Sequence, residues 1–144
     1  MGSIQRSALV RRPAQAMYRL VNDVASYPRL FQWCEGSQVL EASESHMVAS
    51  LRLRAAGLRT GFTTRNLLVP GERIELDLVD GPFRRLSGAW RFQPLAEDAC
   101  KVSLQLDFEV SSRMVGSALA MGFKGLADRM VDDFCRVGAA HGAA

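Results

Sequence analysis

This sequence lacks the features that define several large classes of protein. Its 144 residues contain no run of about 18 apolar residues, the length that a helix needs to cross a membrane. Residues 1–6 lack the apolar core of a signal peptide, so we expect a cytoplasmic protein. The three cysteines, Cys34, Cys100 and Cys135, are odd in number and far apart. They are typical of buried thiols in a reducing compartment, not of a disulfide framework or a zinc site.

Motifs of catalysis are absent as well. The sequence has no glycine-rich phosphate loop, no HExxH, no CxxC and no Gly-x-Ser-x-Gly element. Its two histidines fall in a predicted turn, at His46, and in a tail rich in glycine and alanine, at His141. The carboxylates of the predicted strands alternate with apolar residues, which places them on a solvated face. We therefore predict a binding protein with no catalytic residues, no metal site and no catalytic cofactor.

The composition favours one globular unit. Hydrophobic residues make up 48% of the chain and charged residues 23%, which is enough apolar material for a core. No linker, repeat or low-complexity run divides the sequence, so we predict a single domain over residues 1–144. Only two of the 18 basic residues are lysines, and the net charge is +3. An arginine-rich face suits phospholipid or RNA, although so small a charge is also typical of an ordinary solvated surface.

Hydrophobic periodicity predicts an α+β fold. The clearest strand covers residues 101–110, where every even position is apolar and every odd position polar. Similar alternation between residues 38 and 110 predicts six antiparallel strands. Helical spacing of apolar residues predicts two short helices after a first strand, and one long amphipathic helix near the end of the chain. The predicted ranges are 4–11 for the first strand, 14–24 and 26–33 for the short helices, the second capped by Ser26, and about 112–136 for the long helix.

Seven strands are too wide for one helix to cover. At about 4.8 Å per strand the sheet spans roughly 30 Å, whereas a helix with its side chains is about 10–12 Å across. Either a cavity for an apolar molecule remains under the sheet, or the short helices and aromatic side chains fill the gap. The long helix also contains Gly116, Gly122 and Gly125. These glycines indicate either a close approach to the sheet or a mobile helix that admits a ligand.

Three blocks in the sequence resemble a known family. They are Leu20-Val21-Asn22-Asp23-Val24-Ala25-Ser26-Tyr27-Pro28 with Phe31-Gln32-Trp33-Cys34, then Gly81-Pro82-Phe83 with Leu86, Gly88, Trp90 and Phe92, and finally Arg129-Met130-Val131-Asp132-Asp133-Phe134. In this order they are similar to blocks of the coenzyme Q-binding, START-like family, whose bacterial branch is named for ribosome-association toxins. Gln32 stands where the family usually has proline, in a loop.

The resemblance implies a helix-grip fold, in which a curved antiparallel sheet of about seven strands wraps around the long C-terminal helix. It also implies a non-catalytic protein that binds ubiquinone or a similar isoprenoid lipid and supports respiration as a quinone carrier. Such a carrier visits a membrane surface, and we expect it at the periphery of the inner membrane. Two alternatives stay open: a toxin that binds the large ribosomal subunit and blocks subunit joining, and a polyketide-cyclase-like enzyme with inward-facing polar groups. We expect no DNA partner.

Two sets of candidate site residues follow. The first would line the cavity from the strands, from the long helix and from the cavity mouth: Trp90, Phe92, Leu104, Leu106 and Phe108; Leu119, Phe123, Leu126 and Met130; Tyr27, Pro28, Phe31, Trp33 and Phe83. The second would contact an anionic surface of lipid or RNA: Arg52, Arg54, Arg59 and Arg65 in one predicted hairpin, and Arg84 and Arg85 after a turn.

Overall fold

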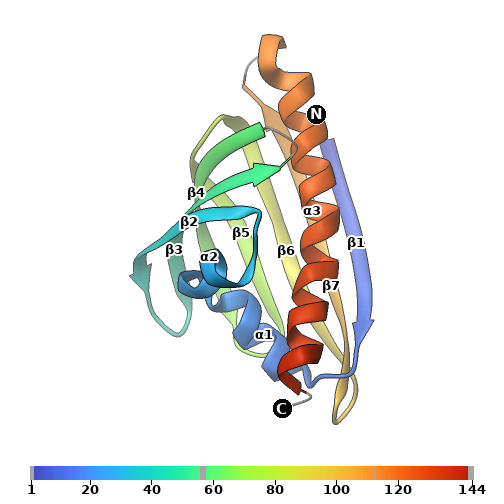
Figure 1. Cartoon of the computed structure of the whole chain (residues 1–144). Helices are drawn as coiled ribbons and strands as arrows, with labels where there is room; N and C mark the ends of the chain where they lie inside the picture. Colours follow the sequence, from blue (N-terminus) through green and yellow to red (C-terminus); the bar gives the residue numbers. More distant parts are fainter. Residues whose placement is uncertain (1, 56–57, 112, 143–144) are drawn as a thin grey trace.

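The computed structural model describes residues 2–55, 58–111 and 113–142. It shows an antiparallel sheet curled around a long C-terminal helix (Figure 1). In chain order the elements are β1 (Gly2–Val10), α1 (Ala14–Asn22), the short 3-10 helix η1 (Val24–Ser26), α2 (Tyr27–Leu30), β2 (Cys34–Ala42), β3 (His46–Ala55), β4 (Leu58–Val69), β5 (Arg73–Asp80), β6 (Phe83–Ala96), β7 (Ala99–Val110) and α3 (Arg113–Gly142).

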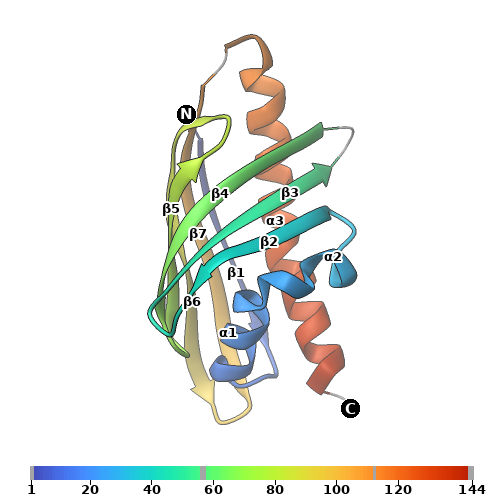
Figure 2. The ribbon, with the colours of Figure 1, turned by 90° about the vertical axis from the view of Figure 1, so that its left-hand side faces the viewer.

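The seven strands form one sheet in the order β1-β7-β6-β5-β4-β3-β2, and every neighbouring pair is antiparallel. From β2 onward each strand therefore pairs with the next one along the chain, while β1 pairs with β7. In β7 the even residues from Cys100 to Phe108 are buried against α3, as the alternation predicts. β2, β3 and β4 run at a steep angle to β6 and β7, so the sheet bends around α3 (Figure 2). The predicted fold class is confirmed.

Element boundaries differ from the predicted ones mainly in the helices. The second short helix ends at Leu30, because Phe31 adopts an extended backbone conformation and the chain then turns into β2. Ser26 does not cap this helix: its hydroxyl donates to Asp23 Oδ2 at 2.6 Å. α3 continues to Gly142, beyond the predicted end at residue 136. The turn predicted at residues 56–57 lies outside the described part of the chain.

Two aromatic clusters fill most of the space between the sheet and α3. The lower cluster consists of Tyr27, Phe31, Trp33, Trp90 and Phe134, with Phe31 and Trp33 stacked at a centroid distance of 4.7 Å. The upper cluster consists of Phe62, Phe83, Phe108 and Phe123. The apolar face of the wide sheet is therefore buried in two ways: the sheet bends around α3, and aromatic rings pack between the sheet and the helix.

Polar contacts and close packing hold the C-terminal part of α3. Trp33 Nε1 donates to Asp133 Oδ2 at 2.9 Å, and Arg6 forms an ion pair with Asp132 at 2.8 Å. A Cβ at Gly138 would lie 2.4 Å from Met17 Sδ, so this glycine allows α3 to pack closely on α1. A Cβ at Gly125 would instead meet nothing within 4 Å, so close approach does not explain that glycine. Within the described residues, no helix combines the length and hydropathy that membrane crossing requires.

Candidate ligand-binding cavity

A small apolar cavity lies between the sheet and α3, and it is bounded by residues of both aromatic clusters. Its volume is about 60 Å³. Every strand from β3 to β7 contributes to its wall, together with α3 and the segment from α1 to α2. The lining residues are Val21, Val24, Tyr27, Ala49, Leu51, Phe62, Thr64, Asn66, Ile74, Leu76, Leu86, Trp90, Leu104, Leu106, Phe123 and Met130.

The cavity is much smaller than the usual site for a small molecule. Sites for small molecules usually measure about 300–1,000 Å³, whereas one water needs roughly 10–15 Å³. A cavity of about 60 Å³ therefore accepts a few waters or a methyl-sized group, but not a quinone ring. We call the present arrangement the closed form, and a larger ligand would require side chains or α3 to move.

Six of the fourteen predicted lining residues are in the wall of this cavity: Tyr27, Trp90, Leu104, Leu106, Phe123 and Met130. They come from both faces of the predicted site, since Leu104 and Leu106 lie on β7 while Phe123 and Met130 lie on α3. The alternation of β7 and the helical spacing of α3 are sufficient to identify these positions.

The other predicted residues lie elsewhere. Pro28 is exposed, and the buried side chain of Leu126 is not part of the cavity wall. Five aromatic residues that were expected around the ligand instead pack in the core, because their rings meet other rings: Phe31 and Trp33 in the lower cluster, Phe83 and Phe108 in the upper cluster, and Phe92 against Tyr18. The prediction for Leu119 falls outside the side chains that the structure describes.

Sequence reasoning missed the contribution of β3, β4 and β5. Ala49, Phe62 and Ile74 are examples of lining residues from these strands. A signal was present in β4, where Phe62, Thr64 and Asn66 occupy alternate positions and all face inward. Because two of these three residues are polar, hydrophobic alternation does not identify this face of the strand as buried.

Thr64 and Asn66 form a polar pair in this apolar wall. Only 8% of Thr64 and 6% of Asn66 is exposed. The Thr64 hydroxyl donates to Asn66 Oδ1 at 2.7 Å. The Tyr27 hydroxyl is the other polar group of note, and it donates to the backbone oxygen of Val21. Burial raises the pKa of Tyr27, so its hydroxyl keeps its proton at physiological pH.

The described lining residues include neither a histidine nor a carboxylate. Carboxylates of the neighbouring strands instead lie at the outer face, where Glu75, for example, pairs with Arg73 at 3.0 Å. Thr64 and Asn66 can donate and accept hydrogen bonds, but they do not form the inward-facing acid and base that proton transfer in a cyclase-type reaction needs.

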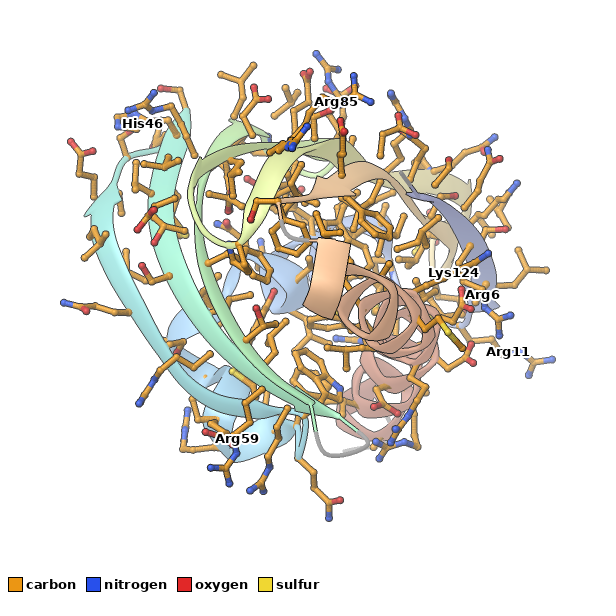
Figure 3. The ribbon with its side chains drawn as sticks, turned by 90° about the horizontal axis from the view of Figure 1, so that it is seen from above. Arg6, Arg11, His46, Arg59, Arg85 and Lys124 are labelled. Carbon is orange, nitrogen blue, oxygen red and sulfur yellow. The ribbon has the colours of Figure 1, made fainter. Side chains whose placement is uncertain are left out.

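The six candidate arginines are all exposed, but they do not form one patch. Figure 3 shows Arg59 and Arg85 on opposite sides of the molecule. Arg59 pairs with Glu35 at 2.9 Å, and Arg84 lies 3.9 Å from Glu109. Arg54 on β3 and Arg59 on β4 are directly paired in the strand register, so positive charge is concentrated at this end of the β3–β4 hairpin.

Arg52, also on β3, lies near the same end of the hairpin, and its position depends on a glycine. A Cβ at Gly36 would lie 2.1 Å from Arg52 Nη2, because the guanidinium packs directly over the glycine on β2. Arg54 is held nearby through its Nε, which donates to the backbone oxygen of Gln32 at 3.1 Å. We call Arg52, Arg54 and Arg59 the β3–β4 arginine group.

The curved sheet closed around a C-terminal helix defines this molecule as a START-like, helix-grip protein. Comparison with solved structures agrees: Zhui aromatase/cyclase from Streptomyces sp. R1128 superposes with a TM-score of 0.85 at 19% identity, covering 95% of this chain and 93% of that one. At this identity the likeness concerns the fold alone. The chain belongs to the polyketide cyclase / dehydrase and lipid transport family, whose model matches residues 10–135.

Two named relatives are similar to this chain over most of its length. The chain is 52% identical over 136 residues to the ribosome association toxin RatA of Vibrio cholerae, and the match covers 94% of each protein. It is 26% identical over 133 residues to the mitochondrial coenzyme Q-binding protein COQ10 of Drosophila melanogaster, where it covers 90% of this chain and 55% of that protein.

Proposed function

We propose that this protein binds ubiquinone or a similar isoprenoid lipid between the sheet and α3, and that it serves respiratory electron transport as a quinone carrier. The observation that carries the proposal is the closed apolar cavity between sheet and helix, with one polar pair in its wall. The lipid-transport description of the family and the name of the coenzyme Q-binding relative support it. Such a carrier would work in the cytoplasm and visit the inner membrane as a peripheral protein.

Binding requires the closed cavity to expand several-fold. Burial of apolar surface supplies about 25 cal/mol per Å², so a polyprenyl chain leaves a membrane only if the protein covers most of it. α3 is the wall best suited to move, because it packs mainly on β1, β7 and α1 and much less on β3 and β4 (Figure 1). Gly125, which packs against nothing, lies on α3 between the lining residues Phe123 and Met130.

The test is extraction of bound lipid from protein purified out of a quinone-producing host, followed by mass spectrometry. We expect an isoprenoid quinone in the extract of the wild type. Met130→Lys places a charge in the cavity wall and should abolish retention, whereas Met121→Lys on the same helix, where the side chain is 77% exposed, should retain the lipid. A wild-type extract without any isoprenoid lipid would contradict the proposal.

A second function is favoured by a separate observation, the name of the relative that is 52% identical over almost the whole chain. In this role the protein would bind the large ribosomal subunit and block subunit joining. The β3–β4 arginine group supports the idea, because arginine binds phosphate oxygens in bidentate geometry and three exposed arginines lie at one end of the β3–β4 hairpin.

This second function predicts salt-sensitive cosedimentation with the large subunit. The double variant Arg52→Glu/Arg54→Glu should weaken binding, and the slope of log affinity against log salt should fall by about one for each arginine that no longer binds a phosphate. The double variant Arg11→Glu/Lys124→Glu, at exposed positions far from Arg59 in Figure 3, is the control with the same change in charge and should bind like the wild type. Absence of cosedimentation at low salt would exclude this function, and the lipid-binding proposal does not depend on that result.

A further inference from the structure

The polar pair in the cavity wall requires an explanation, because it is surrounded by apolar side chains. Thr64 and Asn66 are more than nine-tenths buried, and the residues beside them in the wall include Leu51, Phe62 and Leu76. Burying an amide without a full set of hydrogen-bond partners costs free energy. An apolar pair of similar size would fill the same wall without that cost.

The pair leaves one end of the Asn66 amide available to the cavity. Thr64 Oγ1 donates to Asn66 Oδ1, which directs the amide group and leaves the two N–H donors of Nδ2. The hydrogen bond from Thr64 does not use Nδ2. β4 directs both side chains inward, and Ala49 lies opposite Thr64 on β3, so only a methyl group occupies the wall there.

We infer that the Asn66 amide is a recognition group, which donates a hydrogen bond to a carbonyl oxygen on the ring of a bound quinone. Thr64 is a positioning residue that holds the amide in the donating orientation. The inference rests on the proposed lipid-binding function and narrows it. The cavity would select an isoprenoid lipid whose head carries a carbonyl acceptor over a hydrocarbon chain of the same length.

Donation to a carbonyl is the chemistry that fits this wall. Each N–H of the amide can complete one hydrogen bond, and a quinone carbonyl offers lone pairs without needing to receive a proton in return. A hydrogen bond between the amide and a carbonyl oxygen changes affinity by about five- to tenfold. A pure hydrocarbon in the same place would leave the donor unpaired and gain nothing from it.

The experiment compares two probes, a short-tailed ubiquinone and an isoprenoid hydrocarbon of matched length, by quenching or shift of the fluorescence of Trp90, which lines the cavity. The wild type should prefer the quinone. Asn66→Leu keeps a similar volume and removes the donor, so its quinone affinity should fall about five- to tenfold while its hydrocarbon affinity is unchanged or higher. Thr64→Val, which removes the hydroxyl that orients the amide, should lose a smaller part of the preference.

The outcomes separate the inference from the function on which it rests. If the wild type binds neither probe, the lipid-binding function itself fails. If the wild type binds both probes equally, or if Asn66→Leu keeps the full preference for the quinone, Asn66 does not recognise the carbonyl. If Asn66→Leu loses both probes to the same extent, the residue is structural and the inference is wrong. Retained hydrocarbon binding shows in the same titration that the variant is folded.

Discussion

Filling the cavity should stabilise the protein and weaken ligand binding at the same time. Ala49 lies on β3 with 3% of its surface exposed, and its methyl group lines the cavity. Ala49→Val adds two methyl-sized groups to the wall, on a residue type whose branched side chain suits a strand. The added atoms occupy space that is empty in the closed form, so they stabilise that form in particular.

The expected magnitude follows from the cavity volume. Eliminating a cavity of about 60 Å³ is worth at most about 1.4 kcal/mol at roughly 24 cal/mol per Å³. Burial of two carbon groups gives a similar value, about 1.6 kcal/mol. With an unfolding entropy of about 2.1 cal/mol/K per residue, this raises Tm by up to about 5 °C. If the ligand enters only after the site expands, the same 1.4 kcal/mol raises the Kd about tenfold.

Thermal unfolding and quinone titration of one preparation measure both effects. Ala42→Val, the same change at an exposed position of β2, is the control and should alter stability by less than about 0.5 kcal/mol and leave Kd unchanged. A higher Tm with unchanged quinone affinity would show that the ligand does not use this cavity. A lower Tm would show that the wall is already fully packed at Ala49.

Two further predictions concern backbone packing and pH. Gly88→Ala should destabilise the protein by about 1–3 kcal/mol, since its Cβ would lie 1.9 Å from the backbone oxygen of Gln105. Gly125→Ala should instead stabilise the protein by up to about 1 kcal/mol, because a Cβ there meets nothing within 4 Å and alanine favours the helix. Chemical denaturation of the two variants checks these opposite signs. Burial, with smaller effects of Cys100 and Asp132, raises the pKa of Cys135 to about 11. The unfolded thiol therefore loses its proton at lower pH than the native one, and the free energy of unfolding should fall as pH rises from about 9 to 11; a flat profile over that range would refute this.

The sheet and the long helix were accessible to sequence reasoning because their patterns are local. Alternation in residues 101–110 identifies the buried face of β7, and helical spacing identifies Phe123 and Met130 on the inner face of α3. Periodicity does not give the size of the cavity. It could not foresee that Phe31 and Trp33 would stack on each other in the core, because ring-to-ring contacts join segments that periodicity treats separately.

The polar pair in the cavity wall is the feature that sequence patterns were least able to predict. Thr64 and Asn66 are two polar residues in the middle of a strand, and apart from Phe62 at an alternate position the sequence does not distinguish them from side chains on a solvated face. Only the curvature of the sheet places them inside, because it turns the inner faces of β3, β4 and β5 toward α3. The six candidate arginines also show this dependence on the fold. Their charge suggests a single basic surface, but the fold places Arg59 and Arg85 on opposite sides of the molecule.

The sequence by itself therefore determined the order of the elements, the antiparallel sheet and the inner face of the long helix, all of which follow from side-chain periods of two and about 3.6 residues. The size of the cavity, the polar group in its wall and the distribution of positive charge were decided only by the tertiary structure. These properties depend on how far the sheet bends and on which side chains meet across it, and both result from packing between residues that lie far apart in the chain.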